Sequence, residues 1–201
     1  MTTFKNAQQK MITHIASSEF KKREDAQTTL KSIPILKKII KYGYLTDSSQ
    51  EGMIESGYNK KTKKKYFINE RAYVVGFMKK KYSRKFVDWI NVNTNKISLI
   101  IVNDSSKSFE KKFYDEGNHD GISTIPVTIQ GNTEKRLTPV TNIHLILPSK
   151  IIKFQLEQVS LTKSDDVDYV ACIDPQYGLR ADDKSNGLYK CIIEGLMQMR
   201  K

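Results

Sequence analysis

The chain has few cysteines and no long apolar run. Cys172 and Cys191 are the only cysteines among 201 residues, and each lies in an apolar segment. This pattern predicts two buried thiols in a reducing compartment rather than a disulfide framework. The longest apolar runs, 97–102 and 143–147, are too short to cross a bilayer, and the polar start of the chain does not resemble a signal peptide. We therefore expect an intracellular protein with no transmembrane segment.

The chain also lacks any specific catalytic or metal-binding motif. There is no G-x-S-x-G sequence, and the three histidines are scattered: His14, His119 and His144. Two clusters contain carboxylates that a metal ion would need, but neither has the spacing of a known motif: Asp104, Glu110 and Lys112, and Asp165, Asp166 and Asp168. The sequence thus predicts no catalytic residue, no metal ligand and no cofactor.

What the chain has in excess is positive charge, and that charge is concentrated. The formal net charge is +12, and residues 60–85 alone carry eleven Lys or Arg against one acid, Glu70. Residues 113–201, in contrast, hold ten basic and twelve acidic groups. Clustered charge raises the local potential, so the band predicts an anionic partner such as nucleic acid. The candidate anion-binding residues are Lys60, Lys61, Lys63, Lys64, Lys65, Lys79, Lys80, Lys81, Arg84 and Lys85.

Apolar periodicity predicts an α+β fold, a single domain with a mixed or antiparallel sheet flanked by helices. Residues 1–43 form an N-terminal helical segment, with helices at 3–18 and 25–42, the second interrupted by Pro34 and ended by Gly43. In the α+β core, 44–201, we expect a polar turn at 44–57 and further helices at 80–91 and from about 186 to the end. The expected strands are 66–68, 72–78, 97–102, 122–129, 140–147, 151–159 and 167–173, with a strand-ending turn at 174–178.

Two short motifs resemble the signature of an uncharacterised family. The segment from Ser49 to Gly52 reads S-Q-x-G, and the segment from Arg71 to Phe77 reads R-A-Y-x-x-G-F. This pair is similar to a signature associated with bacteria and large DNA viruses. The family has no established activity, so the resemblance implies no catalytic residue. It does suggest a viral protein, located in the host cytoplasm or nucleus or packaged in the virion beside other virion proteins.

The sequence leaves three functional hypotheses open. The preferred one is a non-enzymatic binding or structural protein that uses the basic residues of 60–85 to contact nucleic acid or another anionic surface. The alternative is a small enzyme or ligand-binding protein for a nucleotide or phosphorylated substrate, with a polar pocket formed by Ser49, Gln50, Arg71 and Tyr73. The third is a protein–protein adaptor whose lysines only maintain solubility. A pocket lined by all four polar residues would favour the second hypothesis.

Overall fold

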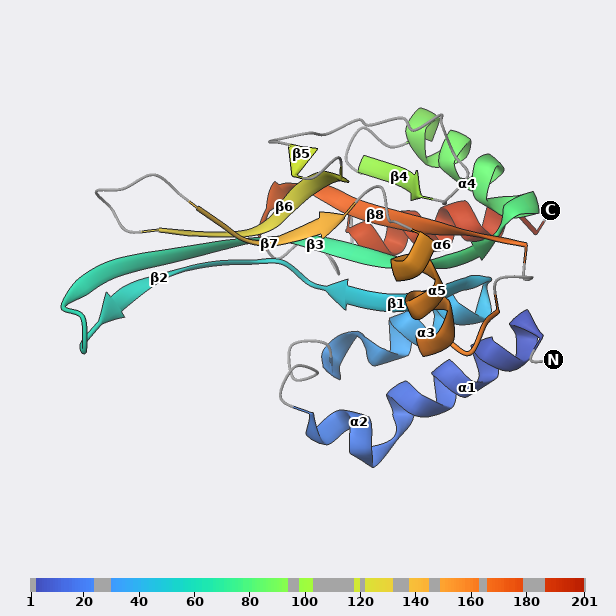
Figure 1. The fold of residues 1–201 in the computed structure, drawn as a ribbon, viewed down its shortest axis with the longest axis horizontal. Coiled ribbons are helices and arrows are strands. Elements are labelled where there is room, and N and C mark those ends of the chain that lie inside the picture. Colours follow the sequence, from blue (N-terminus) through green and yellow to red (C-terminus); the bar gives the residue numbers. More distant parts are fainter. Residues whose placement is uncertain are drawn as a thin grey trace.

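The computed structural model describes residues 3–23, 30–93, 98–102, 118–119, 122–131, 138–144, 149–162, 166–178 and 187–200 (Figure 1). The helices are α1 (Phe4–Ala16), α2 (Ser18–Lys22), α3 (Ile33–Lys41), α4 (Lys80–Asn93), α5 (Ser149–Gln158) and α6 (Leu188–Gln198). The strands are β1 (Tyr44–Gln50), β2 (Met53–Asn59), β3 (Lys64–Lys79), β4 (Ser98–Val102), β5 (Asn118–His119), β6 (Ile122–Gly131), β7 (Thr138–His144) and β8 (Val167–Tyr177). The protein is therefore an α+β domain with an N-terminal helical segment, as the sequence predicts.

Strand β3 organises the sheet, because it pairs with four other strands. Its first half, up to Glu70, pairs with β2 and β6, whereas its second half, from Arg71, pairs with β1 and β8. All described pairings are antiparallel, and the remaining strands extend the sheet through β8 and β6. Sixteen residues at about 3.3 Å each make β3 roughly 50 Å long. Figure 1 shows its first half leaving the body of the molecule as a long ribbon with β2.

Two glycines allow the chain to pass closely around β3. Gly52 lies between β1 and β2 with φ +81°, and a Cβ atom there would lie 2.3 Å from the Gly178 carbonyl oxygen. Gly76, within β3, lies against β1, and a Cβ atom there would lie 2.1 Å from the Leu45 carbonyl oxygen. No side chain fits at either distance. Both glycines of the sequence signature thus have a structural role: Gly52 lies beside the place where β3 changes partners, and Gly76 lies within the β1–β3 pair.

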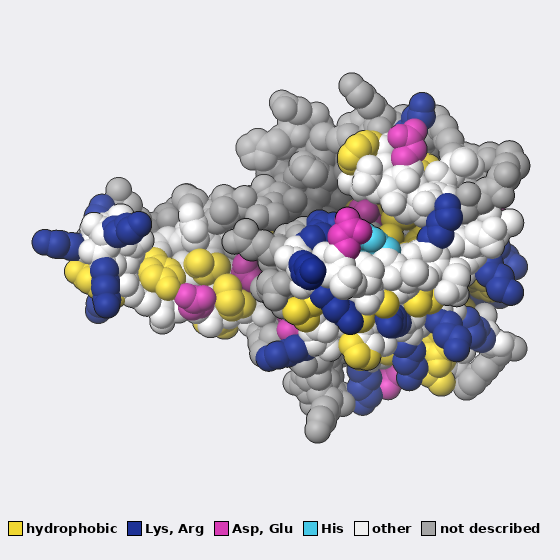
Figure 2. All heavy atoms as spheres, turned by 90° about the horizontal axis from the view of Figure 1, so that it is seen from below, with side chains coloured by type: hydrophobic (Ala, Val, Ile, Leu, Met, Phe, Trp, Pro, Cys, Tyr) yellow, Lys and Arg dark blue, Asp and Glu magenta, His cyan; other side chains and the backbone are white. Residues whose placement is uncertain are grey.

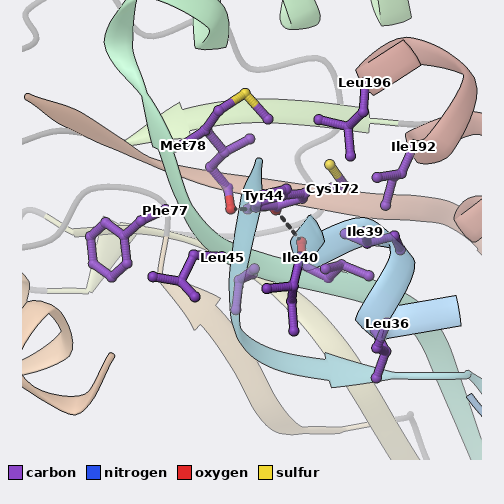
Figure 3. Close-up of a cluster of buried hydrophobic side chains, with 14 of the residues drawn as sticks. Leu36, Ile39, Ile40, Tyr44, Leu45, Phe77, Met78, Cys172, Ile192 and Leu196 are labelled. Atoms are coloured by element: carbon purple, nitrogen blue, oxygen red, sulfur yellow. Dashed lines mark hydrogen bonds between the residues drawn. The ribbon is translucent and has the colours of Figure 1, made fainter. Parts of the chain in front are cut away.

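The core fills both faces of the sheet around the second half of β3. On one face Tyr44 is fully buried, and its hydroxyl lies 2.8 Å from the Val74 carbonyl oxygen and 2.7 Å from that of Val170, so it bonds to β3 and β8. The ring of Phe86 from α4 lies 6.2 Å from the Tyr44 ring. Figure 3 shows this cluster. Helix α3 contributes Ile39 and Ile40, helix α6 contributes Ile192 and Leu196, and strands β3 and β8 contribute Met78 and Cys172.

The opposite face is centred on Phe77, which follows the alternation of side chains along a strand. Its ring packs edge-on against Tyr169, with the ring centroids 5.0 Å apart. Both cysteines are buried and neither forms a disulfide bond, as the apolar segments around them predict. Burial raises the pKa of the Cys172 thiol well above its usual value.

Several elements follow the sequence predictions closely. The N-terminal helix, the helix that begins at Lys80, the β6–β7 pair, the strand at β4 and the final helix are all confirmed. The predicted apolar stripe of α3 is buried, and it consists of Ile33, Leu36, Ile39 and Ile40. Gly43 follows this helix with φ +110°, the conformation expected of a glycine that ends a helix.

Five predictions about local structure are wrong. The polar segment 44–57 is not a turn but contains β1 and most of β2. Polar residues are tolerated there because β2 is mostly exposed and is held by backbone pairing to β3. The predicted strands at 66–68 and 72–78 form one continuous β3, since Glu70 pairs with Met53 on one side and Thr128 on the other. Pro34 does not interrupt a helix but lies in the first turn of α3.

The other two errors concern the C-terminal half. Residues 151–158 belong to helix α5 rather than to a strand, and Val159 directly follows it. Leu156 and Val159, three positions apart, are buried, whereas Phe154 is exposed. Strand β8 continues through Tyr177 instead of ending in a turn after Ile173. The register against β3 shifts in this stretch, and Pro175 sits at that irregularity. Between β4 and β6, residues 118–119 form the short strand β5, and residues 103–117 and 120–121 lie outside the described part of the chain.

We expect Gly76→Ala to lower the free energy of unfolding by about 2 kcal/mol or more, because its new methyl group would overlap backbone atoms of β1 that cannot move independently. Gly57→Ala, on β2 of the ribbon, is the matched control. Its methyl group would meet only the end of the Tyr66 side chain, so a cost below about 1 kcal/mol is expected. Chemical denaturation of both variants measures these costs, and equal costs would contradict the proposed close approach.

Candidate functional site: two basic ends and a polar cleft

The basic residues predicted from the sequence form two separate clusters rather than one band. Lys60, Lys61, Lys63, Lys64 and Lys65 lie at the turn that joins β2 to β3, and all are exposed. Lys79, Lys80, Lys81, Arg84 and Lys85 lie at the far end of β3 and on α4, and they are also exposed. Because β3 separates the groups, they stand roughly 50 Å apart. Figure 2 shows Lys and Arg side chains at the ribbon tip and more of them at the other end of the molecule.

The turn at the ribbon tip is well ordered by its own hydrogen bonds. The Asn59 side-chain oxygen accepts from the backbone N–H groups of Lys61, at 3.0 Å, and Thr62, at 3.1 Å. Lys63 adopts φ 53°, the left-handed conformation that closes such turns. The five lysines therefore project from a defined turn.

The polar residues of the predicted pocket lie on two paired strands: Ser49 and Gln50 on β1, Arg71 and Tyr73 on β3. Gln50 faces Tyr73 across the β1–β3 pair, and its side chain donates to the Arg71 carbonyl oxygen at 3.2 Å. The hydroxyls of Ser48 and Tyr73 are 3.3 Å apart. Ser49 lines a different feature, a cleft of about 470 Å³ whose described walls do not include Gln50, Arg71 or Tyr73.

Arg71 has the environment of a structural residue. Its side chain is only 4% exposed, and its guanidinium carbon lies 4.5 Å from the centre of the Tyr177 ring on β8. A stacked cation of this kind stabilises the pairing of the strands that carry it. Arg71 therefore joins β3 to β8 close to the place where the register shifts.

The cleft lined by Ser49 contains one carboxyl group with an unusual environment. Asp47 on β1 accepts a hydrogen bond from the Tyr169 hydroxyl at 3.4 Å, and burial raises its pKa to about 6. His14 and Ser48 also line this cleft. A carboxyl group with a raised pKa in a cleft is a general feature of acid–base sites. The Ser48 hydroxyl in this cleft contacts the Tyr73 hydroxyl, at 3.3 Å.

The acidic clusters have structural roles where they are described. Asp166 forms an ion pair with Lys80, with 3.5 Å between the charged atoms, and its carbonyl oxygen accepts from the Lys80 backbone N–H. The buried Asp168 accepts a hydrogen bond from the Ser83 hydroxyl at 2.5 Å. Both contacts hold the start of α4 against β8.

The described part of the chain contains no group of three His, Cys, Asp or Glu side chains that could bind a metal. Asp104, Glu110, Lys112 and Asp165 lie outside it.

Neither a protein-family model nor a curated protein matches this chain. The resemblance to an uncharacterised family therefore stays a prediction. Within the described residues, no helix has the length and the apolar character that crossing a bilayer requires.

Asp47→Asn should stabilise the protein more at pH 8 than at pH 4.5. Burial raises the pKa of Asp47 in the folded protein to about 6, above the ordinary aspartate value of 3.8, so the folded protein favours the protonated form. The resulting stability is fully present below about pH 4 and is lost as the pH rises to about 6. Asparagine remains neutral throughout, so it avoids the cost of a buried charge at pH 8.

The measurement is the melting temperature of the wild type and of Asp47→Asn at pH 4.5 and at pH 8. For a chain of this length, a shift of about 2 to 4 °C corresponds to 1 kcal/mol. Asp88→Asn, which changes an exposed carboxylate on α4, is the control and should show no such pH-dependent gain. A melting temperature of Asp47→Asn below that of the wild type at pH 8 would show that the charged form is favoured instead.

Proposed function

We propose that this protein is a non-enzymatic component that binds nucleic acid, or a similar polyanionic surface, through the tip of its β2–β3 ribbon. The observation that carries the proposal is the group of five exposed lysines on one ordered turn: Lys60, Lys61, Lys63, Lys64 and Lys65. Phosphate contacts by lysine release counterions, and this release drives binding without sequence preference.

The shape of the ribbon supports duplex nucleic acid as the partner. Beyond Phe67, where pairing with β6 ends, the described ribbon consists of β2 and β3 alone. A two-stranded ribbon fits the major groove of B-DNA, which is about 12 Å wide. The tip is narrow enough to enter the groove while its lysines meet the phosphates on either side.

The charges of the ribbon support the same partner. Residues 57–66 contain no acidic side chain. Glu55, the nearest acid on β2, accepts a hydrogen bond from the Tyr66 hydroxyl at 2.7 Å. The lysines of the tip are therefore not neutralised by carboxylates of the same segment, and their potential acts on an external anion.

The second basic cluster, at the far end of β3 and on α4, can contact the same polymer or a neighbouring one. Its distance from the tip, roughly 50 Å, corresponds to about 15 base pairs of duplex at 3.4 Å each. Lys80 is partly neutralised by Asp166, which weakens this cluster relative to the tip. The ribbon tip is therefore the primary contact in this proposal.

The alternative, an enzyme acting on a nucleotide or phosphorylated substrate through Ser49, Gln50, Arg71 and Tyr73, has less support. Arg71 is nearly buried against Tyr177, and Ser49 lines a cleft whose described walls exclude the other three. A location in the virion, and contact with other virion proteins, rests only on the family resemblance and stays a prediction.

The proposal predicts that Lys60→Gln, Lys61→Gln and Lys63→Gln together weaken binding to duplex DNA and reduce its salt dependence. Each phosphate contact contributes about 0.9 to the slope of log affinity against log salt, so three lost contacts reduce the slope by about 2 to 3. Fluorescence anisotropy with an unrelated-sequence 20-base-pair duplex, from low to physiological salt, measures the slope.

The matched control makes the same change in charge elsewhere. Lys10, Lys31 and Lys153 are exposed lysines on other elements, and replacing all three with glutamine should leave the slope almost unchanged. An equal loss in both triple variants would indicate only a response to net charge. Unchanged binding of the ribbon variant would refute the proposed contact.

A further inference from the structure

We propose that a second site, at the end of the molecule opposite the ribbon tip, binds a compact anion with two or more phosphate groups. A cleft of about 660 Å³ lies between the beginnings of α1 and α4 and the ends of α3 and α6. Its volume is within the range of about 300 to 1,000 Å³ that small-ligand sites occupy. In Figure 1 both chain termini lie at this end, away from the ribbon.

Five cationic side chains from separate parts of the chain line this cleft: Lys5, Lys41, Lys79, Lys81 and Arg200. None of the described residues in its wall is acidic. Lys81 donates to the Tyr82 hydroxyl, and together with Lys79 and Arg200 it lowers the pKa of Tyr82. The potential within the cleft is therefore positive.

Helix electrostatics explain only part of this arrangement. Lys41 and Arg200 lie at the ends of α3 and α6, where positive charge is favourable. Lys5 and Lys81 are each the second residue of a helix, α1 and α4, and Lys79 directly precedes α4. Positive charge is unfavourable at a helix N-terminus, and neither helix has an acidic residue in its first turn. An anion bound in the cleft would reverse this cost, because it would meet both the lysines and the two helix N-termini.

Aromatic side chains hold several of the cations in place. The Arg200 guanidinium carbon lies 4.7 Å from the centre of the Tyr42 ring, and its Nη2 donates to the Lys41 carbonyl oxygen at 2.7 Å. Lys81 Nζ lies 4.6 Å from the centre of the Tyr82 ring, and Lys79 Nζ lies 5.6 Å from that of Phe4. Cations held on ring faces lose less conformational freedom when an anion binds.

These contacts indicate which ligand the cleft selects. Phe4, Tyr42 and Tyr82 in its wall each contact a cation, so these rings position charge and their occupied faces do not stack against a nucleotide base. Five cations around one small volume match a triphosphate or an equivalent group of phosphates better than a single carboxylate. Such a group can belong to a free polyphosphate or nucleotide, or to a phosphoinositide headgroup. The shared chemistry is the cluster of phosphates.

The test is calorimetric titration of the full chain with inorganic tripolyphosphate at low salt, with adenosine as a phosphate-free comparison. We expect one tripolyphosphate to bind and adenosine not to bind. Lys5→Gln combined with Lys41→Gln should weaken binding at least tenfold, which is about 1.4 kcal/mol. Arg200→Gln should do the same, and circular dichroism checks that both variants are folded. Lys10→Gln combined with Lys153→Gln is the control of equal charge and should bind as the wild type does.

A parallel arm uses vesicles that contain a phosphatidylinositol bisphosphate. Binding of tripolyphosphate alone identifies a free ligand, whereas cleft-dependent vesicle binding identifies a headgroup, and either result supports the site. No binding in either arm, or equal weakening by the control, would overturn it. The inference does not rest on the proposed function: the ribbon variant should lose duplex binding and keep tripolyphosphate binding, and the Lys5/Lys41 variant should do the opposite.

Discussion

The close passage of the chain around β3 is the constraint on which the rest of the structure depends. One long strand serves two sets of neighbours, and the exchange occurs within a few residues of Arg71. There Gly52 lies against Gly178 and Ala72, and Gly76 lies against β1. Side chains at these two positions would force the strands apart. With glycine at both positions, the second half of β3 is buried between helices, and the first half is free to extend away from the core as a ribbon.

This division separates the two basic clusters and gives them different environments. The lysines of residues 60–65 project from a narrow, ordered turn, whereas those at the other end of β3 adjoin a cleft formed by four helices. A narrow projection suits the groove of a long polymer, and a cleft with cations around it suits a small anion. The two proposed kinds of binding therefore use different parts of the same excess of positive charge, because β3 keeps its ends roughly 50 Å apart.

The sequence predicts the elements that have strong periodicity and misses those that depend on tertiary pairing. The stripe of Ile33, Leu36, Ile39 and Ile40 identifies a helix, whereas β2 has little apolar pattern and exists because β3 pairs with it. The ten basic candidates were found from composition, but their separation follows from the continuity of β3. The cleft was missed because Lys5, Lys41 and Arg200 come from distant segments, and no local pattern relates them.

The most direct test of the account measures the reactivity of every lysine at once. The protein is acetylated briefly at low salt with and without a saturating duplex, and the sites are quantified by mass spectrometry. We expect the duplex to protect Lys60, Lys61 and Lys63 strongly and to leave Lys10, Lys31 and Lys153 unchanged, because the tip is a narrow group of exposed lysines with no acidic side chain in residues 57–66. Uniform protection across all lysines, or protection that spares the tip, would contradict the claim that the ribbon is the primary contact.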